Sequence, residues 1–463
     1  MSALLNRQRI SVAAVLSAMA MVVLDASLVN VALPTIATSL NESAGATILV
    51  VSAYQAALLA GLLPAAHVAE RVGYRRLFVA GLALFTGASV LCAFAPTLLT
   101  LVAARVLQGL GGAAIMSLGI ALLRFALGPD RLAAAIGWNA LTVALCSAAG
   151  PVAGALILSV APWPWLFLAK LPVSAIALAA ATALPKIEPT QASVDWRGMA
   201  LHAASAAMVV IAAQFAMLRP YLAIVLGSVA VAFTVLLVRR ERNRPAPLLP
   251  VDLLALRPFR VSVAASVCCF TGQSAGLLAL PLYLQLSLGK GALTSAFVLT
   301  CWPVGVAVAS RFANGLTARF GAPALCTAGA SLLAGALLIC ALWPRHGQIG
   351  VLAVAVAAAV SGLGFGLFQV PNNRNMFMSA PAERSAAAGG LQGSARLAGQ
   401  TLGALMTSLL FTGLPDAVAP RVAMGVGAFV AGAAALVSVL DAPGLSRFLS
   451  PRPFVRLEKG EIT

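Results

Sequence analysis

The sequence predicts an all-α protein that crosses a lipid bilayer many times. Of its 463 residues, 61% are hydrophobic and only 9% are charged, whereas soluble domains carry about 25% charged residues. Apolar stretches of about 20 residues, long enough to cross a bilayer as a helix, recur along most of the chain. The first stretch is too long for the core of a signal peptide and has no convincing cleavage site, so we interpret it as a retained helix.

Hydrophobic runs separated by polar or Gly- and Pro-containing breaks predict fourteen membrane-spanning helices. They are expected at 11–39, 45–69, 75–95, 98–125, 131–160, 162–184, 198–217, 219–239, 259–288, 292–315, 321–343, 347–372, 385–412 and 418–442.

The net charge of +17 is explained by the positions of the basic residues rather than by nucleic-acid binding. If the N-terminus is cytoplasmic, 23 Lys and Arg residues fall in cytoplasmic segments and 4 in external loops. Basic residues collect in cytoplasmic loops of membrane proteins. Both termini are therefore expected in the cytoplasm, and no nucleic-acid partner is expected.

The chain contains an internal repeat. The segment ERVGYRRLFVAG (70–81) is similar to ARFGAPALCTAG (318–329), and AGPVAGAL (149–156) is similar to AGQTLGAL (398–405), with offsets of 248 and 249 residues. Matching segments in the same order indicate a duplicated bundle, which is typical of transporters whose halves rock about a central cavity. The offset between the repeats is longer than the stretch of chain that holds the first six spans, and the difference is about the length of two helices. We therefore predict an N-terminal six-helix bundle (1–184), two inserted helices with a cytoplasmic linker (185–258), and a C-terminal six-helix bundle with a short cytoplasmic tail (259–463).

Asp25 lies inside the apolar run MVVLDASLVNVALP (21–34). A charged side chain in the bilayer core is costly, so such residues usually face a cavity and serve ion pathways. Burial favours the protonated form of a carboxylate, which suits a group that binds and releases protons. We predict a role in proton or substrate binding; the alternative is a carboxylate locked permanently to an arginine.

Arg105 is the predicted partner of Asp25, because the two residues lie at depths that agree within about one helical turn. Gln108, Gly109 and Gly112 follow Arg105 at i+3, i+4 and i+7, so they share one face of the helix. We predict that Arg105 pairs with Asp25 and that protonation of Asp25 weakens the link. The alternative is that Arg105 binds only backbone carbonyls.

Glycines in the fifth and thirteenth spans predict close helix contacts. Gly150 and Gly154 lie one turn apart, which lets helices approach closely, and Pro151 between them bends the helix. The second-half copy keeps both glycines, Gly399 and Gly403, and has Gln400 in place of the proline.

Polar residues within the spans are candidates for lining a central cavity. Arg396, one turn before Gly399, is a candidate in the second half; snorkelling or capping of a neighbouring helix is the alternative reading. The predicted cavity or substrate-facing set is Asn30, Gln108, Lys170, Gln273, Arg396 and Gln400.

The segment after the second span, ERVGYRR, is expected to turn sharply at Gly73. A carboxylate there can meet the positive N-terminus of a helix in the other half and hold one conformation. The alternative is that these charges only set topology. The predicted gating residues are Glu70, Arg71, Gly73, Arg75 and Arg76, with Arg319 in the second-half copy, which lacks the acid.

Three motifs together resemble the major facilitator superfamily, most closely its fourteen-helix drug:proton antiporter branch. They are LDASLVNVALP (24–34), RVLQGLGGA (105–113) and GPVAG (150–154). The resemblance covers nearly the whole chain. It implies export of small molecules from the cytoplasm across a bacterial inner membrane, driven by inward proton flow, with the GPVAG segment tied to antiport and to sealing the cavity.

Several positions depart from the pattern of that branch. Glu70 replaces an aspartate, Tyr74 a basic residue, and Cys146 and Ala155 two glycines. Lys170 stands where the branch usually has asparagine, and it is the departure most expected to alter what is carried.

Other functional classes have little support in the sequence. There is no phosphate-binding G-x-x-x-x-G-K-[ST] motif, no H-E-x-x-H and no G-x-S-x-G. The seven cysteines lack metal-ligand spacing. We expect no enzyme activity, no metal and no cofactor other than a proton gradient.

The expected partners are a small-molecule substrate, protons and the lipid bilayer, with the chain acting as a monomer. The leading hypothesis is export of small amphipathic molecules or drugs, of neutral, monocationic or anionic type. One alternative is export of a specific endogenous metabolite, lipid or siderophore. A non-transporting sensor is a weaker alternative, because the tails are short.

Overall fold

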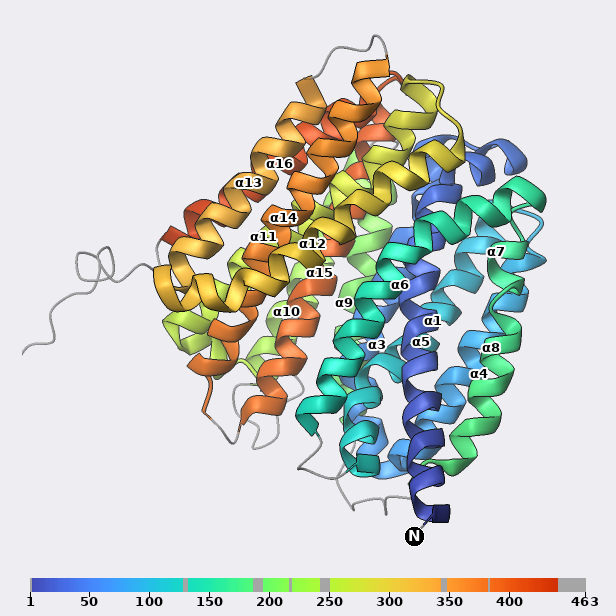
Figure 1. The fold of residues 1–463 in the computed structure, drawn as a ribbon, viewed down its shortest axis with the longest axis vertical. Helices are drawn as coiled ribbons and strands as arrows, with labels where there is room; N and C mark the ends of the chain where they lie inside the picture. The colour runs from blue at the N-terminus through green and yellow to red at the C-terminus, as the bar shows by residue number, and fades with distance from the viewer. Residues whose placement is uncertain are drawn as a thin grey trace, which may run out of the picture.

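The computed structural model describes residues 2–127, 132–185, 195–215, 219–241, 250–342, 348–381 and 384–439. Within these residues the secondary structure is helical, with no strand. The helices form an elongated bundle in which the N-terminus lies at one end of α1 (Figure 1).

Fourteen helical segments in the described part of the chain follow the fourteen predicted spans in order. The short helix α2 precedes α3, and two short helices, α7 and α8, share the sixth span. The bounds are α1 Ser2–Leu40, α2 Ala44–Thr47, α3 Leu49–Val72, α4 Tyr74–Ala93, α5 Leu98–Leu127, α6 Leu132–Val160, α7 Trp165–Leu168, α8 Leu171–Ala180, α9 Trp196–Phe215, α10 Pro220–Glu241, α11 Arg257–Leu282, α12 Ala292–Phe320, α13 Ala322–Leu342, α14 Gln348–Ser379, α15 Ser385–Gly413 and α16 Ala419–Val439.

Among the described residues, eleven helices are long and apolar enough to cross a membrane. Two further helices, α6 and α9, carry the shorter apolar segments Leu145–Val160 and Trp196–Ala212. The last of the fourteen helical segments, α15, is more polar and contains Arg396. The chain is thus a polytopic helical membrane protein, as predicted.

The sixth span differs from the single helix predicted at 162–184. The helix α7 ends at Leu168, and α8 begins at Leu171 with Pro172 in its first turn. Because proline has no backbone N–H, it cannot continue the hydrogen bonding of the preceding turn. The break leaves Lys170 at the N-cap of α8, where its carbonyl accepts the backbone N–H of Ser174 at 2.9 Å.

The helices before and after the insert form two groups that lie side by side in Figure 1. The N-terminal group contains α1 to α8, and the C-terminal group contains α11 to α16. The inserted helix α9 contacts α10 and α3. The ring of His202 on α9 lies 3.4 Å from the carbonyl oxygen of Leu59, which makes it an interface residue. Many apolar side chains of α10 are exposed, as expected for a helix that faces lipid.

The two groups share a core cluster at one end of the molecule, and α15 also packs on α3 near Leu62 and Leu63. The core cluster at that end combines residues of both groups, such as Leu33, Leu280 and Phe411. The other three clusters stay within one group, apart from Leu397 in the N-terminal cluster. Side chains also bridge the groups there: Ser408 Oγ to Gly45 O at 2.8 Å, Gln285 Nε2 to Val31 O at 3.3 Å and Thr300 Oγ1 to Ala148 O at 3.3 Å.

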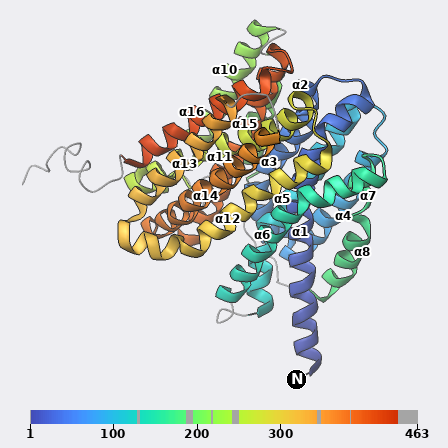
Figure 2. The ribbon, with the colours of Figure 1, turned by 45° about the horizontal axis from the view of Figure 1, so that its top comes forward.

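We call the end that holds this shared cluster the closed end. It is the end where α1 leads into α2, and α2 lies beside α15 in the turned view (Figure 2). The distribution of basic residues predicts that this end is external.

Candidate functional site

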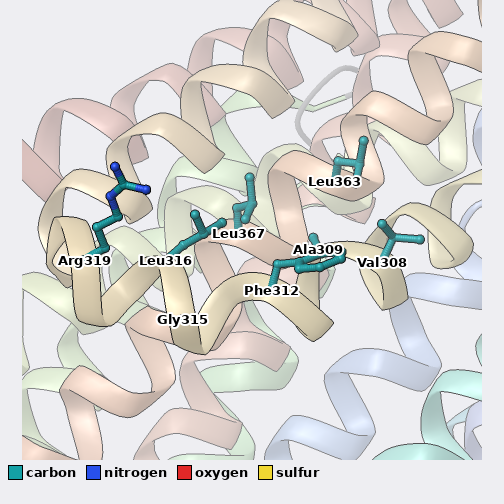
Figure 3. A pocket seen from close by; sticks show the side chains of 8 residues that line it. All are labelled: Val308, Ala309, Phe312, Gly315, Leu316, Arg319, Leu363 and Leu367. Atoms are coloured by element: carbon teal, nitrogen blue, oxygen red, sulfur yellow. The ribbon is translucent and has the colours of Figure 1, made fainter.

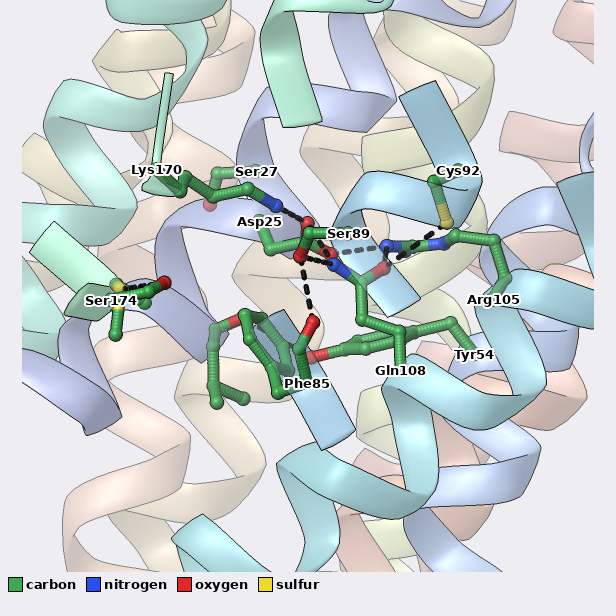
Figure 4. A network of polar contacts seen from close by, with 12 residues as sticks. Asp25, Ser27, Tyr54, Phe85, Ser89, Cys92, Arg105, Gln108, Lys170 and Ser174 are labelled. Atoms are coloured by element: carbon green, nitrogen blue, oxygen red, sulfur yellow. Dashed lines mark hydrogen bonds and ion pairs between the residues drawn. The ribbon is translucent and has the colours of Figure 1, made fainter. Parts of the chain in front are cut away.

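Asp25 forms the centre of a buried polar network (Figure 4). It lies on α1 and forms ion pairs with Arg105 Nη1 of α5 and with Lys170 Nζ at the break between α7 and α8. Gln108 Nε2, one turn after Arg105, donates to Asp25 Oδ1 at 3.1 Å. Asp25, Arg105 and Gln108 are 0% exposed and Lys170 is 6% exposed, so the ion pairs are shielded from solvent.

Arg105 fulfils both roles that the sequence left open. It pairs with Asp25, as the matching depths predict, and its Nε also donates to the carbonyl oxygen of Val50 on α3 at 3.0 Å. Its Nη1 further donates to Gln108 Oε1 at 2.5 Å. The guanidinium therefore ties α1, α3 and α5 together through one group.

Gln108 extends the network to α4. Its Nε2 donates to Ser89 Oγ at 2.8 Å, and Ser89 Oγ donates to the carbonyl oxygen of Phe85 at 2.8 Å. The thiol of Cys92 lies 3.8 Å from Gln108 Oε1. Through these contacts Asp25 is connected to α3, α4, α5 and α8. A change in its charge therefore affects four other helices of the N-terminal group.

Aromatic rings surround the two cations. The guanidinium carbon of Arg105 lies 4.1 Å from the centre of the Tyr54 ring, and Lys170 Nζ lies 5.2 Å from the Phe167 ring and 5.5 Å from the Phe85 ring. Cations are attracted to ring faces, and the attraction is stronger where water is excluded. These rings partly replace the hydration that both cations lose.

The site contains one more cation than anions. With Asp25, Arg105 and Lys170 all ionised, the net charge of this buried cluster is +1. In addition, Arg105 Nη2 is buried without a hydrogen-bond partner. Among the described acidic residues, the others lie at helix ends or in connections, so excess positive charge is the main electrostatic feature of the site.

The glycines of the fifth span pack α6 against α1 next to Asp25. A Cβ on Gly150 would overlap the Cβ of Ser27, and a Cβ on Gly154 would lie 3.2 Å from the carbonyl oxygen of Leu28. Both contacts are on the turn that follows Asp25. A movement of α6, which also contains Pro151, is therefore transmitted directly to the site.

The second-half copy makes the equivalent contact between α15 and α11. A Cβ on Gly399 would lie 2.6 Å from the carbonyl oxygen of Val267, and Gly403 packs directly on the carbonyl oxygen of Thr271. Gly109 has the same role on α5, where a Cβ would lie 2.5 Å from the carbonyl oxygen of Tyr54. Gly112 lies further along the same contact: its Cβ would be 3.3 Å from the Tyr54 hydroxyl.

Four predicted cavity-facing residues are not joined to the Asp25 network by any contact in the described residues. Three carry a buried polar atom without a hydrogen-bond partner: Asn30 Oδ1, Gln273 Oε1 and Arg396 Nε. Gln55 Oε1 on α3 is also buried without a hydrogen-bond partner. The backbone carbonyl of Gln400 accepts Ser274 Oγ at 2.9 Å. Unpartnered buried polar atoms are costly, and here they occur in both halves.

The predicted gating loop adopts the expected turn. Gly73 has φ +97° and separates α3 from α4, and Gly321 in the second-half copy has φ +84° between α12 and α13. Both values favour glycine. The charged side chains of the first loop, and Arg319, lie at the ends of these helices, where Glu70, Arg71, Arg76 and Arg319 are exposed and Arg75 is half-buried. A gating role for them stays a prediction.

An apolar groove of about 520 Å³ lies apart from this site, on α12 and α14 (Figure 3). Its lining includes the exposed side chains of Val308 and Phe312, with Arg319 at one end. Such a surface suits contact with lipid tails and does not include any residue of the Asp25 network.

The contact between Lys170 and Asp25 is the part of the site that sequence reasoning missed, together with Tyr54 and Ser89. Lys170 was predicted to face the cavity, not to pair with Asp25. The depth argument that linked Arg105 to Asp25 applies equally to Lys170, which lies about eight residues from the outer end of its span. The depths of the three charges within these spans therefore indicate that Lys170 lies level with Asp25 and Arg105.

Comparisons with known proteins agree with this architecture. A family model described as Major Facilitator Superfamily matches residues 15–404. The chain is 38% identical to an uncharacterized transporter of Escherichia coli, YebQ, over 86% of this chain and 87% of the relative. It is 28% identical to the riboflavin transporter RibZ of Clostridioides difficile (84% and 85%). It is also 28% identical to the multidrug efflux pump LfrA of Mycolicibacterium smegmatis (93% and 87%). All three relatives are transporters and none is an enzyme.

Proposed function

The chain belongs to the Major Facilitator Superfamily of membrane transporters, and from this premise we propose that it exports small amphipathic molecules or drugs from the cytoplasm in exchange for protons. The observation that carries the proposal is the buried ion-pair network around Asp25. Ionisable residues within the membrane are costly and are typical of proton relays in transporters.

The contacts between the two halves support alternating access. The bridging hydrogen bonds and the shared core cluster are concentrated at one end. If that end is external, as the positive-inside rule predicts, the structure corresponds to a state closed to the outside. Exchange with a state closed to the inside requires these contacts to break while each half keeps its own core.

The coupling step follows from the position of the network. The carboxylate of Asp25 connects α1 to α5 and α8, and Gly150 and Gly154 hold α6 on the same part of α1. A change of protonation alters these ion pairs and hence the packing of α1, α5 and α6. The energy source is the proton gradient across a bacterial inner membrane, with both termini cytoplasmic and no further cofactor.

Substrate contacts are proposed for the buried polar atoms without partners in both halves, including those of Asn30, Gln273 and Arg396. A few polar groups within an apolar interior suit amphipathic molecules. A narrower alternative is export of one endogenous metabolite, which the similarity to a riboflavin transporter favours.

The test uses purified protein in vesicles and records lumenal pH as a panel of drugs, dyes and riboflavin is added. We expect substrate-triggered proton movement in the wild type and its loss in Asp25→Asn. The matched control is Asp416→Asn, which makes the same change at an exposed residue between α15 and α16. Proton movement with riboflavin alone would favour the metabolite alternative. Proton movement that is equal in wild type and Asp25→Asn would refute the role of Asp25.

A further inference from the structure

The Asp25 network contains two possible proton carriers, and their charges distinguish them. Arg105 is not one of the two, because a guanidinium stays protonated in proteins. Asp25 could gain a proton, or Lys170 could lose one. Both residues are buried and in direct contact, so only one of these changes can be the low-cost step.

Protonation of Asp25 would leave two adjacent cations without a counter-ion. The cluster would change from +1 to +2 in a site that is shielded from water, and buried unpaired charges are strongly unfavourable. Loss of a proton from Lys170 has the opposite effect. It leaves the pair of Asp25 and Arg105, with a net charge of zero and all the hydrogen bonds of Gln108 in place.

We propose that the exchangeable proton of this transporter is carried by Lys170 Nζ, while Asp25 stays ionised as its counter-ion. This inference rests on the proposed function, because it names the carrier for proton-coupled export. It also explains what the unusual lysine at this position does: it adds the second cation that makes protonation of Asp25 costly.

The groups that surround Lys170 are consistent with this assignment. From α1 it faces Asp25, and from the cluster on α5 the nearby charge is Arg105. The α4 helix contributes Phe85 and the thiol of Cys92 within the same network, and α3 contributes Tyr54. The helices α6 and α8 contain no acidic or basic residue, and Cys146 is the one titratable side chain of α6. Among the described residues, Asp25 is therefore the single anion that contacts the ammonium.

The proposed cycle is balanced in protons. On the external side the amine lone pair of Lys170 takes a proton from water, and the resulting ammonium pairs with Asp25. On the cytoplasmic side the N–H bond breaks, the proton passes to water, and the lone pair returns to Nζ. The cluster alternates between +1 and zero.

This alternation restricts the substrate. A monocationic substrate and the ammonium proton repel each other and compete for Asp25, which is the mutual exclusion that antiport requires. An anion would bind best to the +1 form and would move together with the proton. Export coupled to this site therefore suits monocationic substrates rather than anions.

The assignment can be tested without a substrate, because the chain has only four lysines, Lys170, Lys186, Lys290 and Lys459. Solid-state ¹⁵N spectra of ¹⁵Nζ-lysine protein in vesicles distinguish ammonium from amine. Lys170→Asn identifies the Lys170 signal, and Lys290→Asn is the control for a loop lysine. We expect the Lys170 signal to change from ammonium to amine as pH rises, while the carboxyl signal of ¹³C-labelled Asp25 stays that of a carboxylate.

A transport measurement provides the second test, with tetraphenylphosphonium as the monocationic probe. We expect Lys170→Arg, whose charge is permanent, to lose probe-driven proton movement. Lys170→Asn, which removes the titratable amine, is also expected to lose it, whereas Lys290→Arg, the same kind of change at a loop lysine, is expected to retain it. Gel filtration checks that each variant is folded.

The possible outcomes separate the two proposals. A Lys170 signal that stays ammonium while Asp25 becomes protonated would overturn the assignment, as would proton movement in Lys170→Arg equal to that of wild type. Titration of Lys170 as expected, with no proton movement for any compound of the panel, would instead refute proton-coupled export and leave the assignment of the proton intact.

Discussion

The charge balance of the Asp25 network predicts a specific pattern of stabilities. In Asp25→Asn the cations of Arg105 and Lys170 face each other across a neutral amide. Two unit charges about 5 Å apart at an effective dielectric constant of about 20 repel each other by about 3 kcal/mol. Loss of one partner from a buried ion pair costs about 3–5 kcal/mol. We therefore expect Asp25→Asn to lower the free energy of unfolding by about 3–5 kcal/mol.

Removing the second cation should recover much of this loss. Lys170→Met keeps an unbranched chain against Phe85 and Phe167 and leaves the neutral pair of Asp25 and Arg105, so we expect a change within about 1 kcal/mol. The double variant should then be more stable than Asp25→Asn, with a coupling energy of about 1–3 kcal/mol. The coupling should be larger at low pH, where Lys170 is fully protonated.

The measurement is unfolding of the purified variants in mixed micelles with a rising fraction of sodium dodecyl sulfate. The matched control is the cycle of Asp252→Asn and Arg384→Met, an ion pair whose side chains are 53% and 33% exposed. Exposed pairs contribute less than about 1 kcal/mol. Single changes at Asp25 and Lys170 that simply add, within about 0.5 kcal/mol, would refute the charge argument.

Three further predictions follow from the packing. Gly150→Leu should abolish proton movement in vesicles because its side chain overlaps Ser27, whereas Gly87→Leu, with open space around the glycine, should not. Gly73→Ala, at φ +97°, should lower the free energy of unfolding by about 1–2 kcal/mol, measured in the same mixed micelles. Ser408→Ala removes a hydrogen bond of 2.8 Å across the closed end; a loss of about 1 kcal/mol should increase the population open at that end, measured by spin-label distances between the halves.

Much of the fold follows from local pattern. The length and spacing of the apolar runs predicted the order of the fourteen helical segments. The repeat predicted equivalent contacts: Gly73 and Gly321 both end a helix with positive φ, and Gly150 and Gly399 both pack on the first helix of their half. These features depend on backbone chemistry within a few residues, which is why they can be predicted from the sequence.

The less predictable features depend on contacts between distant segments. Pro172 ends the hydrogen bonding that would have made the sixth span one helix, and this places Lys170 at a cap. Its pairing with Asp25 requires α1 and α8 to be neighbours, which hydrophobic pattern does not specify. The closed end of the molecule is a choice between two packings of the same halves, so no local signal predicts it.

The two halves share a packing plan but differ in chemistry. In both, a glycine pair holds the fifth helix of the half against the first. In the N-terminal half that contact lies beside two cations and one carboxylate, whereas Arg396 in the C-terminal half has a buried Nε without a hydrogen-bond partner. A common movement of the halves can therefore change proton affinity in one and polar contacts to a substrate in the other. Because the halves are duplicated, they can move in the same way. Because their buried charges differ, that movement can couple a proton in one half to a substrate in the other.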